Sequence, residues 1–163
     1  MSILVSAHVI DTAVCLQAFR QRQSVRCGAM VDFSGLMRQD EQGCPVALWL
    51  EHYPSMTERM LNEHMEQAKE CFGLLDVEVR HRIGRIEAAE VIVWVATAAA
   101  HRRAAFEGCM YLMDYLKTEA PFWKRNIGPA GPEDWVGART FDAEQRRRWE
   151  RQFSMPGAPF DAY

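Results

Sequence analysis

The sequence predicts an α+β fold with one main domain, and three observations support this class. Apolar residues recur at helical spacing in three segments, and in several others they alternate or run continuously, which is typical of strands. Hydrophobic residues make up 48% and charged residues 25% of the 163 residues, the composition of a globular protein with a real core. No apolar run reaches the roughly 18 residues that a membrane-spanning helix needs.

The N-terminal part of the chain is predicted to begin with a strand and a helix. A short strand around 3–9 leads into a helix from Thr12 to about Gln21. Asp11 and Thr12 precede the first apolar positions of this helix, and such side chains cap the unpaired N–H groups of a first turn. We therefore expect the helix to start at this pair.

Two strands are predicted next, joined by a polar turn. The range 25–37 is predicted as a long strand interrupted by Gly28 and Gly35, which indicate bulges or points of close backbone approach. Residues 39–44 are polar and form the turn, and 46–52 forms the second strand. We expect these two strands to pair with each other as a hairpin.

The middle of the chain is predicted to hold a long helix and two strands. Pro54 opens a helix that runs to about Phe72, where Gly73 stops it. Alternating apolar residues predict a half-buried strand over 75–83, and the continuous apolar run 91–96 predicts a more fully buried one. This mixture of helices and strands is what the α+β class requires.

A third helix and a mixed C-terminal region complete the prediction. The helix covers about 101–117 and is followed by a short strand at 123–127. A short helix is expected near 144–153, with a loose tail after it. We divide the chain into a main domain at 1–140 and a C-terminal extension at 141–163.

Charge and cysteine usage exclude several function classes. The formal net charge is −3, from 19 basic and 22 acidic side chains, whereas a protein that binds nucleic acid non-specifically is normally basic. The five cysteines are an odd number without a CxxC pair, which argues against a disulfide framework and a tetrahedral zinc site. We predict free thiols, no metal and no cofactor, in a cytoplasmic protein that binds neither nucleic acid nor membranes.

The junction at 97–103 is the first candidate site. It joins the most apolar predicted strand to a helix, and a helix N-terminus favours an anion because its N–H groups are unpaired. His101, Arg102 and Arg103 add positive charge that opposes the helix macrodipole, which a bound phosphate or carboxylate would offset. The alternative is a solvated turn whose arginines pair with Glu107 or another carboxylate.

The segment 117–124 is the second candidate site. Only three of the 19 basic side chains are lysines, and two of them, Lys117 and Lys124, lie seven residues apart. Desolvation beside Phe122 and Trp123, together with mutual repulsion, would favour loss of a proton from one amine, which could then act as a proton shuttle or nucleophile. The alternative is that both are surface lysines, because most charged side chains are solvated.

Several motifs, in unbroken order along about residues 3–140, resemble the catalytic (large) subunit of molybdopterin synthase. They are GAMVDFSGLMR at 28–38, LEHYPSMTE at 50–58, HRIG at 81–84, AHRRAAFE at 100–107 and MDYLKTEAPFWKR at 113–125. Several separate motifs in the right order are far more specific than any one of them. The sequence is therefore identified as a member of this family.

The resemblance implies a sulfurtransferase of molybdenum-cofactor biosynthesis. This family converts a cyclic pyranopterin monophosphate, precursor Z, into the dithiolene molybdopterin. The sulfur arrives as a thiocarboxylate on the C-terminal Gly-Gly of a small ubiquitin-like subunit, so no cysteine of the large subunit need act. Two large subunits form a central homodimer with one small subunit at each end. The implied fold has an α/β hammerhead-like part and a further antiparallel β-rich part.

The family's two active-site lysines match Lys117 and Lys124. The resemblance assigns Lys117 to the thiocarboxylate terminus and substrate, and Lys124 to proton transfer or to a developing oxyanion. The other implied substrate contacts, which hold the pterin phosphate and polar edge or form apolar walls, are Phe33, Met37, Arg38, His101, Arg102, Met113, Arg125, Asn126 and Arg139. The chain departs from the family pattern at Leu36 and Met37, where a lysine is common, and at Glu119, where a basic residue is frequent. These departures bear on substrate affinity.

The predicted third helix separates the two candidate sites. His101 and Lys117 lie sixteen residues apart, about 24 Å along a straight helix, and a pterin phosphate is less than half that long. Because the resemblance places both on one substrate, we expect a second copy of the chain to supply one of them. The alternative is a kinked or shorter helix with two separate sites.

Two other classes of function compete with the enzyme. One is a non-catalytic module that binds the ubiquitin-like partner, and the other is an anion- or nucleotide-binding regulator that uses the His101 end alone.

Overall fold

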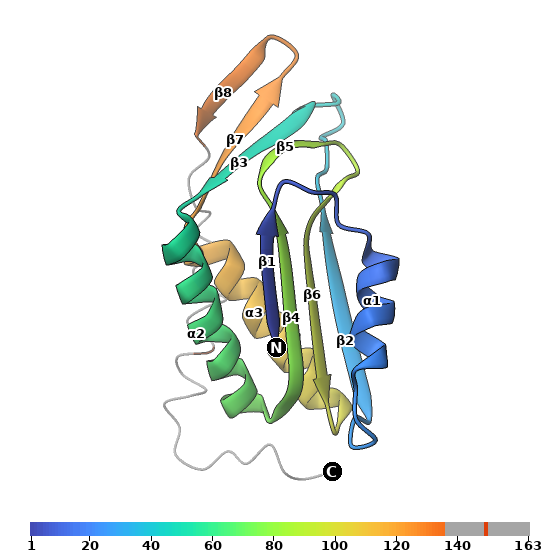
Figure 1. Ribbon diagram of the computed structural model, residues 1–163. Helices are drawn as coiled ribbons and strands as arrows, with labels where there is room; N and C mark the ends of the chain where they lie inside the picture. The colour runs from blue at the N-terminus through green and yellow to red at the C-terminus, as the bar shows by residue number, and fades with distance from the viewer. Residues whose placement is uncertain (136–148, 150–163) are drawn as a thin grey trace.

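Two four-stranded β-sheets and three helices make up the described part of the chain, residues 1–135 and Trp149, in this computed structural model (Figure 1). Helices cover both faces of the first sheet, and the second sheet extends beyond one end of the first (Figure 1). The predicted α+β class is confirmed. The boundary expected at residue 140, the extension after it and the short helix near 144–153, apart from Trp149, lie outside the described residues.

The first sheet has the strand order β1-β4-β6-β2. Its strands are β1 (Ser2–Ser6), β2 (Ala29–Leu36), β4 (Leu74–Arg82) and β6 (Val91–Ala99). β1 runs parallel to β4, and the other neighbours are antiparallel. β6 is a central strand with helices packed over both of its faces, which explains its continuous apolar run.

The ends of all three predicted helices are confirmed to within about one residue. The helices are α1 (Thr12–Gln21), α2 (Pro54–Phe72) and α3 (Arg102–Thr118). Asp11 caps α1 by accepting hydrogen bonds from the N–H groups of Ala13 and Val14, both at 3.1 Å. Gly73 ends α2 in the left-handed conformation, with a φ of 65°. α1 packs on one face of the first sheet, and α2 and α3 pack on the other (Figure 1).

Trp149 joins the main core, which lies between the first sheet and the layer of α2 and α3. Its side chain is 2% exposed, although it is far along the chain from the other residues of this core. The ring packs edge-on against Phe72 and Tyr111, with centroid distances of 5.6 and 5.8 Å. Its indole N–H donates to Asp114 Oδ2 at 2.8 Å. The Trp149 side chain is therefore part of this core, in contact with both α2 and α3.

The second sheet has the strand order β5-β3-β7-β8 and is antiparallel throughout. Its strands are β3 (Ala47–His52), β5 (Gly84–Glu87), β7 (Phe122–Gly128) and β8 (Gly131–Trp135). Its small core consists of Met37, Leu48, Leu50 and Ile86. The sequence does not predict β5 and β8, because both are short and carry few apolar side chains.

The hairpin expected between 25–37 and 46–52 is wrong. β2 pairs with β6 in the first sheet, whereas β3 pairs with β5 and β7 in the second. The polar turn carries the chain from one sheet to the other, and Asp40 stabilises it by accepting from the N–H groups of Gln42 and Cys44 at 3.0 and 2.8 Å. Alternation along the chain predicts a strand but not its partner, because packing decides the pairing.

Gly28 and Gly35 are a point of close backbone approach and a bulge, as predicted. Gly28 lies against the end of β6, where an added Cβ would be 2.2 Å from the Ala100 carbonyl oxygen. Gly35 lies at a register shift between β2 and β6, and a Cβ there would be 2.8 Å from Val93 Cγ1. Both positions therefore require a residue without a side chain.

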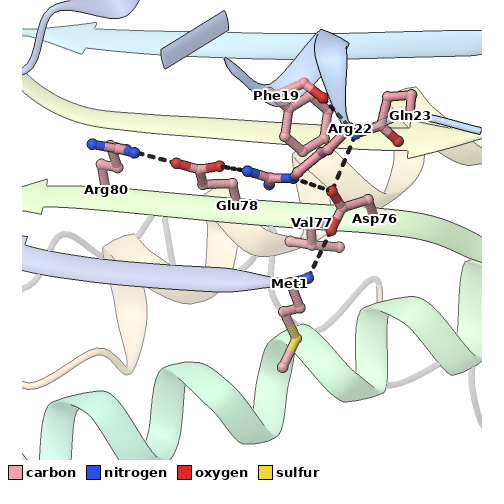
Figure 2. A network of polar contacts seen from close by, with 8 residues as sticks. All are labelled: Met1, Phe19, Arg22, Gln23, Asp76, Val77, Glu78 and Arg80. Carbon is pink, nitrogen blue, oxygen red and sulfur yellow. Dashed lines mark hydrogen bonds and ion pairs between the residues drawn. The ribbon is translucent and has the colours of Figure 1, made fainter. Parts of the chain in front are cut away.

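A network of charged groups links the end of α1 to β4 (Figure 2). Glu78 is 1% exposed, and its two carboxylate oxygens lie 2.6 Å from Arg22 and from Arg80. Arg22 also lies 2.6 Å from Asp76, which is 2.8 Å from the α-amine of Met1. Because burying a carboxylate is costly unless it is paired, these two arginines explain how Glu78 can be buried in β4.

Asp76 is expected to make the stability of the fold sensitive to acid. Burial alone would raise the pKa of Asp76, but hydrogen bonds from the Met1 amine, Arg22 and Gln23 outweigh it and lower the pKa to about 2. A carboxyl whose pKa is lowered by folding stabilises the fold above its ordinary pKa of 3.8 and loses that contribution as the pH falls towards 2.

Asp76→Asn is therefore expected to lower the free energy of unfolding by on the order of 2 kcal/mol at neutral pH. The difference from the unsubstituted protein should shrink as the pH falls from 4 to 2. Urea unfolding across this range measures it, and Asp134→Asn, at an exposed position of β8, is the control. A difference that does not change with pH would contradict this account.

Candidate functional site

The first cationic cluster lies where β6 leads into α3. Thr97 of β6 donates its buried hydroxyl to the Ala105 carbonyl at 2.7 Å, and this bond ties the strand to the first turn of the helix. His101 is the N-cap residue, but its side chain makes no capping hydrogen bond. His101 and Arg102 are both exposed, and within residues 1–135 and 149 neither forms an ion pair.

Arg103 is the member of the cluster that pairs within the helix. Its Nε lies 2.9 Å from Glu107 Oε1, one turn further along α3. The predicted alternative of pairing with Glu107 is thus confirmed for Arg103. The pair between Arg103 and Glu107 does not involve His101 or Arg102. These two residues lie at the N-terminal end of α3, where the unpaired N–H groups favour an anion.

Gly28→Ala is expected to unfold more easily, because the added methyl would lie 2.2 Å from the Ala100 carbonyl oxygen and the backbone before α3 must move. We expect a loss of about 1–3 kcal/mol in the free energy of unfolding. The matched control is Gly108→Ala, where the added Cβ would meet only the flexible end of Leu74, at 2.7 Å. Urea unfolding compares the two, and equal losses would show that the backbone approach at Gly28 is unimportant.

The two candidate lysines lie on either side of a short corner, residues 119–121, that joins α3 to β7. Lys117 is exposed in the last turn of α3, and Lys124 is half-buried in β7. The corner begins where the N–H of Glu119 donates to the Tyr115 carbonyl at 2.9 Å. Both lysines therefore belong to the end of the molecule where α3 meets the second sheet (Figure 1).

The register of β7 separates the predicted contacts of this strand onto two faces. Lys124 and Asn126 pair with two leucines of β3 that belong to the small core, so both lie on the face of that core. Arg125 lies on the other face, where its guanidinium carbon is 4.6 Å from the centroid of the Trp135 ring. Asn126, and not Arg125, shares a face with Lys124.

The remaining predicted contacts lie on several elements. Phe33 is 40% exposed in β2, and Arg38 is exposed just beyond the end of that strand. Met113 is half-buried on α3 and packs against the main core. Met37 is 4% exposed in the small core, where its side chain supports the second sheet. Arg139 lies outside the described residues.

Within one chain, α3 keeps the two cationic clusters apart. It is a single helix of 17 residues that runs along the first sheet (Figure 1), so His101 and Lys117 are about 24 Å apart. Because β2 is antiparallel to β6, Arg38 lies at the lysine end of the first sheet. The structure thus groups Arg38 with the lysines at one end, and places His101 and Arg102 at the other.

Sequence reasoning does not identify the side chains that hold the corner. Thr57 of α2 donates its hydroxyl to the Pro121 carbonyl at 3.5 Å. His81 of β4 stacks on Phe122, with ring centroids 3.8 Å apart and an interplanar angle of 12°. The sequence carries one signal for His81, which is that it continues the inward-facing alternation of β4 after Val79.

The five cysteines are all free, as predicted. In the part of the chain that the structure describes, no helix is long and apolar enough to cross a membrane. Among the same residues, no three His, Cys, Asp or Glu side chains lie close enough together to hold a metal ion.

The α+β fold carries cations at both ends of one helix and lysines on either side of a short corner, an arrangement that suits the class of proteins acting on anionic reactants. The MoaE protein family matches residues 5–119, and the chain belongs to this family. The molybdopterin synthase catalytic subunit of Pseudomonas aeruginosa is 44% identical over 151 residues, which cover 92% of this chain and 99% of that protein. The same subunit of Caulobacter vibrioides is 50% identical over 125 residues, covering 77% of this chain and 82% of that one.

Solved structures have the same fold. The molybdopterin biosynthesis MoaE protein from Burkholderia ambifaria superposes with a TM-score of 0.77 at 40% identity, covering 91% of this chain and 97% of that one. Molybdopterin synthase from Staphylococcus aureus gives a TM-score of 0.72 at 27% identity and covers 82% of this chain and 96% of that one. The resemblance found in the sequence motifs is confirmed.

Proposed function

We propose that the chain is the catalytic subunit of a molybdopterin synthase, which transfers sulfur to a cyclic pyranopterin monophosphate. The donor in this proposal is the thiocarboxylate at the C-terminal Gly-Gly of a small ubiquitin-like subunit. The observation that carries the proposal is the placement of Lys117 and Lys124 on either side of one short corner, in a chain 44–50% identical to proteins named molybdopterin synthase catalytic subunit. Its five free thiols are in keeping with the reducing cytoplasm as the place of action.

The two lysines are suited to different tasks. Lys117 is exposed at a helix end, so its long flexible side chain can reach the negative tail of a docked partner. Lys124 is half-buried beside the small core, where a lower dielectric strengthens its attraction for a developing oxyanion. We assign Lys117 to the thiocarboxylate and substrate, and Lys124 to proton transfer or oxyanion stabilisation.

We propose that two copies of the chain share each site. His101 and Arg102 carry the charge to bind the pterin phosphate, but α3 holds them about 24 Å from Lys117. A second copy could bring its own His101 end beside the lysines of the first. Phe106 and Met110, which are 59% and 46% exposed one turn apart on α3, supply apolar surface for such a contact.

The proposal is tested by reconstitution with a thiocarboxylated small subunit and the cyclic pterin. Mass spectrometry should detect a pterin that has gained sulfur and a small subunit whose terminal sulfur is replaced by oxygen. A small subunit that binds without loss of sulfur would instead indicate a non-catalytic binding module. Absence of both binding and turnover would leave an anion-binding protein that uses the His101 end alone.

A further inference from the structure

The corner at 119–121 separates the two lysines and is held by side chains from other elements. Thr57 of α2 donates to the last carbonyl of the corner, at 3.5 Å. His81 of β4 contacts the next residue, Phe122, which is the first residue of β7. This second contact acts directly on the strand that carries Lys124.

His81 lies against Phe122 as a flat ring in the interior. It is 7% exposed, its ring centroid is 3.8 Å from that of Phe122, and the two planes differ by 12°. Its Nδ1 is 2.8 Å from the carbonyl oxygen of Arg82, and because a carbonyl can only accept, Nδ1 must carry the proton. One hydrogen bond therefore sets the orientation of the imidazole plane on which Phe122 rests.

Burial keeps this imidazole uncharged at neutral pH. Desolvation lowers the pKa of His81 to about 4, with a further small lowering from the nearby His52, while the bond to the Arg82 carbonyl opposes the shift. A neutral ring stacks on an apolar phenyl ring without the cost of burying a charge. His81 can therefore act as a fixed support for Phe122.

Phe122 and Lys124 lie on the same face of β7. Successive side chains of a strand alternate between its faces, so residues two apart lie on the same face, about 6.6 Å from each other along the strand. Phe122 pairs with His52 and Lys124 pairs with Leu50 in the same register of β3. A shift or rotation of Phe122 would thus move the start of β7 and redirect the lysine.

We propose that His81 is a positioning residue, which fixes Phe122 and through it the half-buried amine of Lys124. This inference rests on the proposed sulfur transfer and deepens it by naming a residue that acts without touching the reactants. The inference predicts that the side chain at position 81, in β4 of the first sheet, affects the rate of sulfur transfer beside Lys124, in β7 of the second sheet.

The test compares three variants of the full chain, assembled with the thiocarboxylated small subunit. His81→Ala removes the support, and His81→Phe keeps a ring against Phe122. Val77→Ala is the matched control, because Val77 is fully buried on the same inward face of β4 but four residues from His81. Urea unfolding of each variant is measured beside kcat and KM for the pterin.

We expect His81→Ala to lower kcat by about 10- to 100-fold with KM changed less than about twofold, since misplacing a reacting group acts mainly on kcat. His81→Phe should recover kcat to within about fivefold of the unsubstituted protein. Val77→Ala should lose stability but keep kcat. The inference is overturned if His81→Ala and Val77→Ala have the same kcat, or if the phenylalanine variant is as slow as the alanine variant.

A failure of the proposed function would look different. In that case the unsubstituted protein itself would not transfer sulfur, and the variants would have no rate to compare. Nitrogen-15 NMR of the imidazole gives a readout that is independent of turnover. It should detect the Nδ1–H tautomer of His81 unchanged between pH 5.5 and 8, and protonation of the ring within that range would overturn the inference.

Discussion

Replacing Lys117 with alanine is expected to lower the rate of sulfur transfer by about 10²–10⁴-fold while leaving the fold intact. The side chain is exposed in the last turn of α3, so its removal exposes no core surface. The folding cost is limited to the favourable interaction of a cation with a helix C-terminus, typically about 0.3–1 kcal/mol. Single-turnover rates with the thiocarboxylated small subunit measure the loss, and urea unfolding checks the stability.

Two further variants separate the role of the amine from that of charge and helix position. Lys69→Ala removes a lysine from the last turn of α2, where it lies 3.6 Å from Glu66, and should leave the rate unchanged. Lys117→Arg should be nearly as slow as Lys117→Ala if the step needs a compact ammonium or an amine that can lose its proton. If the arginine variant kept most of the rate, positive charge alone would suffice.

The helices could be predicted from the sequence because their signals are local. Asp11 caps α1 within three residues, and Gly73 ends α2 where it follows the last apolar position. Strand partners depend on residues far away in the chain. β3 pairs with β5 and β7, whose first residues are Gly84 and Phe122, and nothing in the sequence of β3 distinguishes these partners from β2.

The candidate site was predictable in its residue types but not in its assembly. Lysine is rare in this chain, so Lys117 and Lys124 attract attention, and the charge beside His101 does so as well. The contacts that hold the corner between the lysines leave no local pattern, because Thr57 and Pro121 are 64 residues apart. Thr57 and Pro121 come into contact because α2 and β4 pack against the start of β7. The periodicity of the sequence does not predict such packing.

A site shared between two copies has a second large consequence. Arg102→Ala and Lys117→Ala chains, each inactive alone, are expected to regain about a quarter of the unsubstituted activity when they are unfolded together, mixed and refolded. In a mixed dimer one site carries both substitutions, while the other combines an intact Arg102 with an intact Lys117 from the opposite chain. Random mixing makes half of the dimers mixed, and one of the two sites in each mixed dimer is intact. A quarter of all sites are therefore active.

The lysine end supplies a control that must give the opposite result. Lys117 and Lys124 flank one corner of the same chain, so every site in a mixture of Lys117→Ala and Lys124→Ala chains lacks one of the two amines. That mixture should stay inactive even though mixed dimers form, which mass spectrometry of the intact complexes can verify.

Recovery in the first mixture but not in the second would assign the His101 end and the lysine end of each site to different chains. Inactivity in both mixtures, with mixed dimers present, would mean that each site is built within one chain. Because α3 is one unbroken helix from Arg102 to Thr118, its two ends would then have to bind different anions, and the phosphate of the pterin would need a cation at the lysine end, where Arg38 also lies.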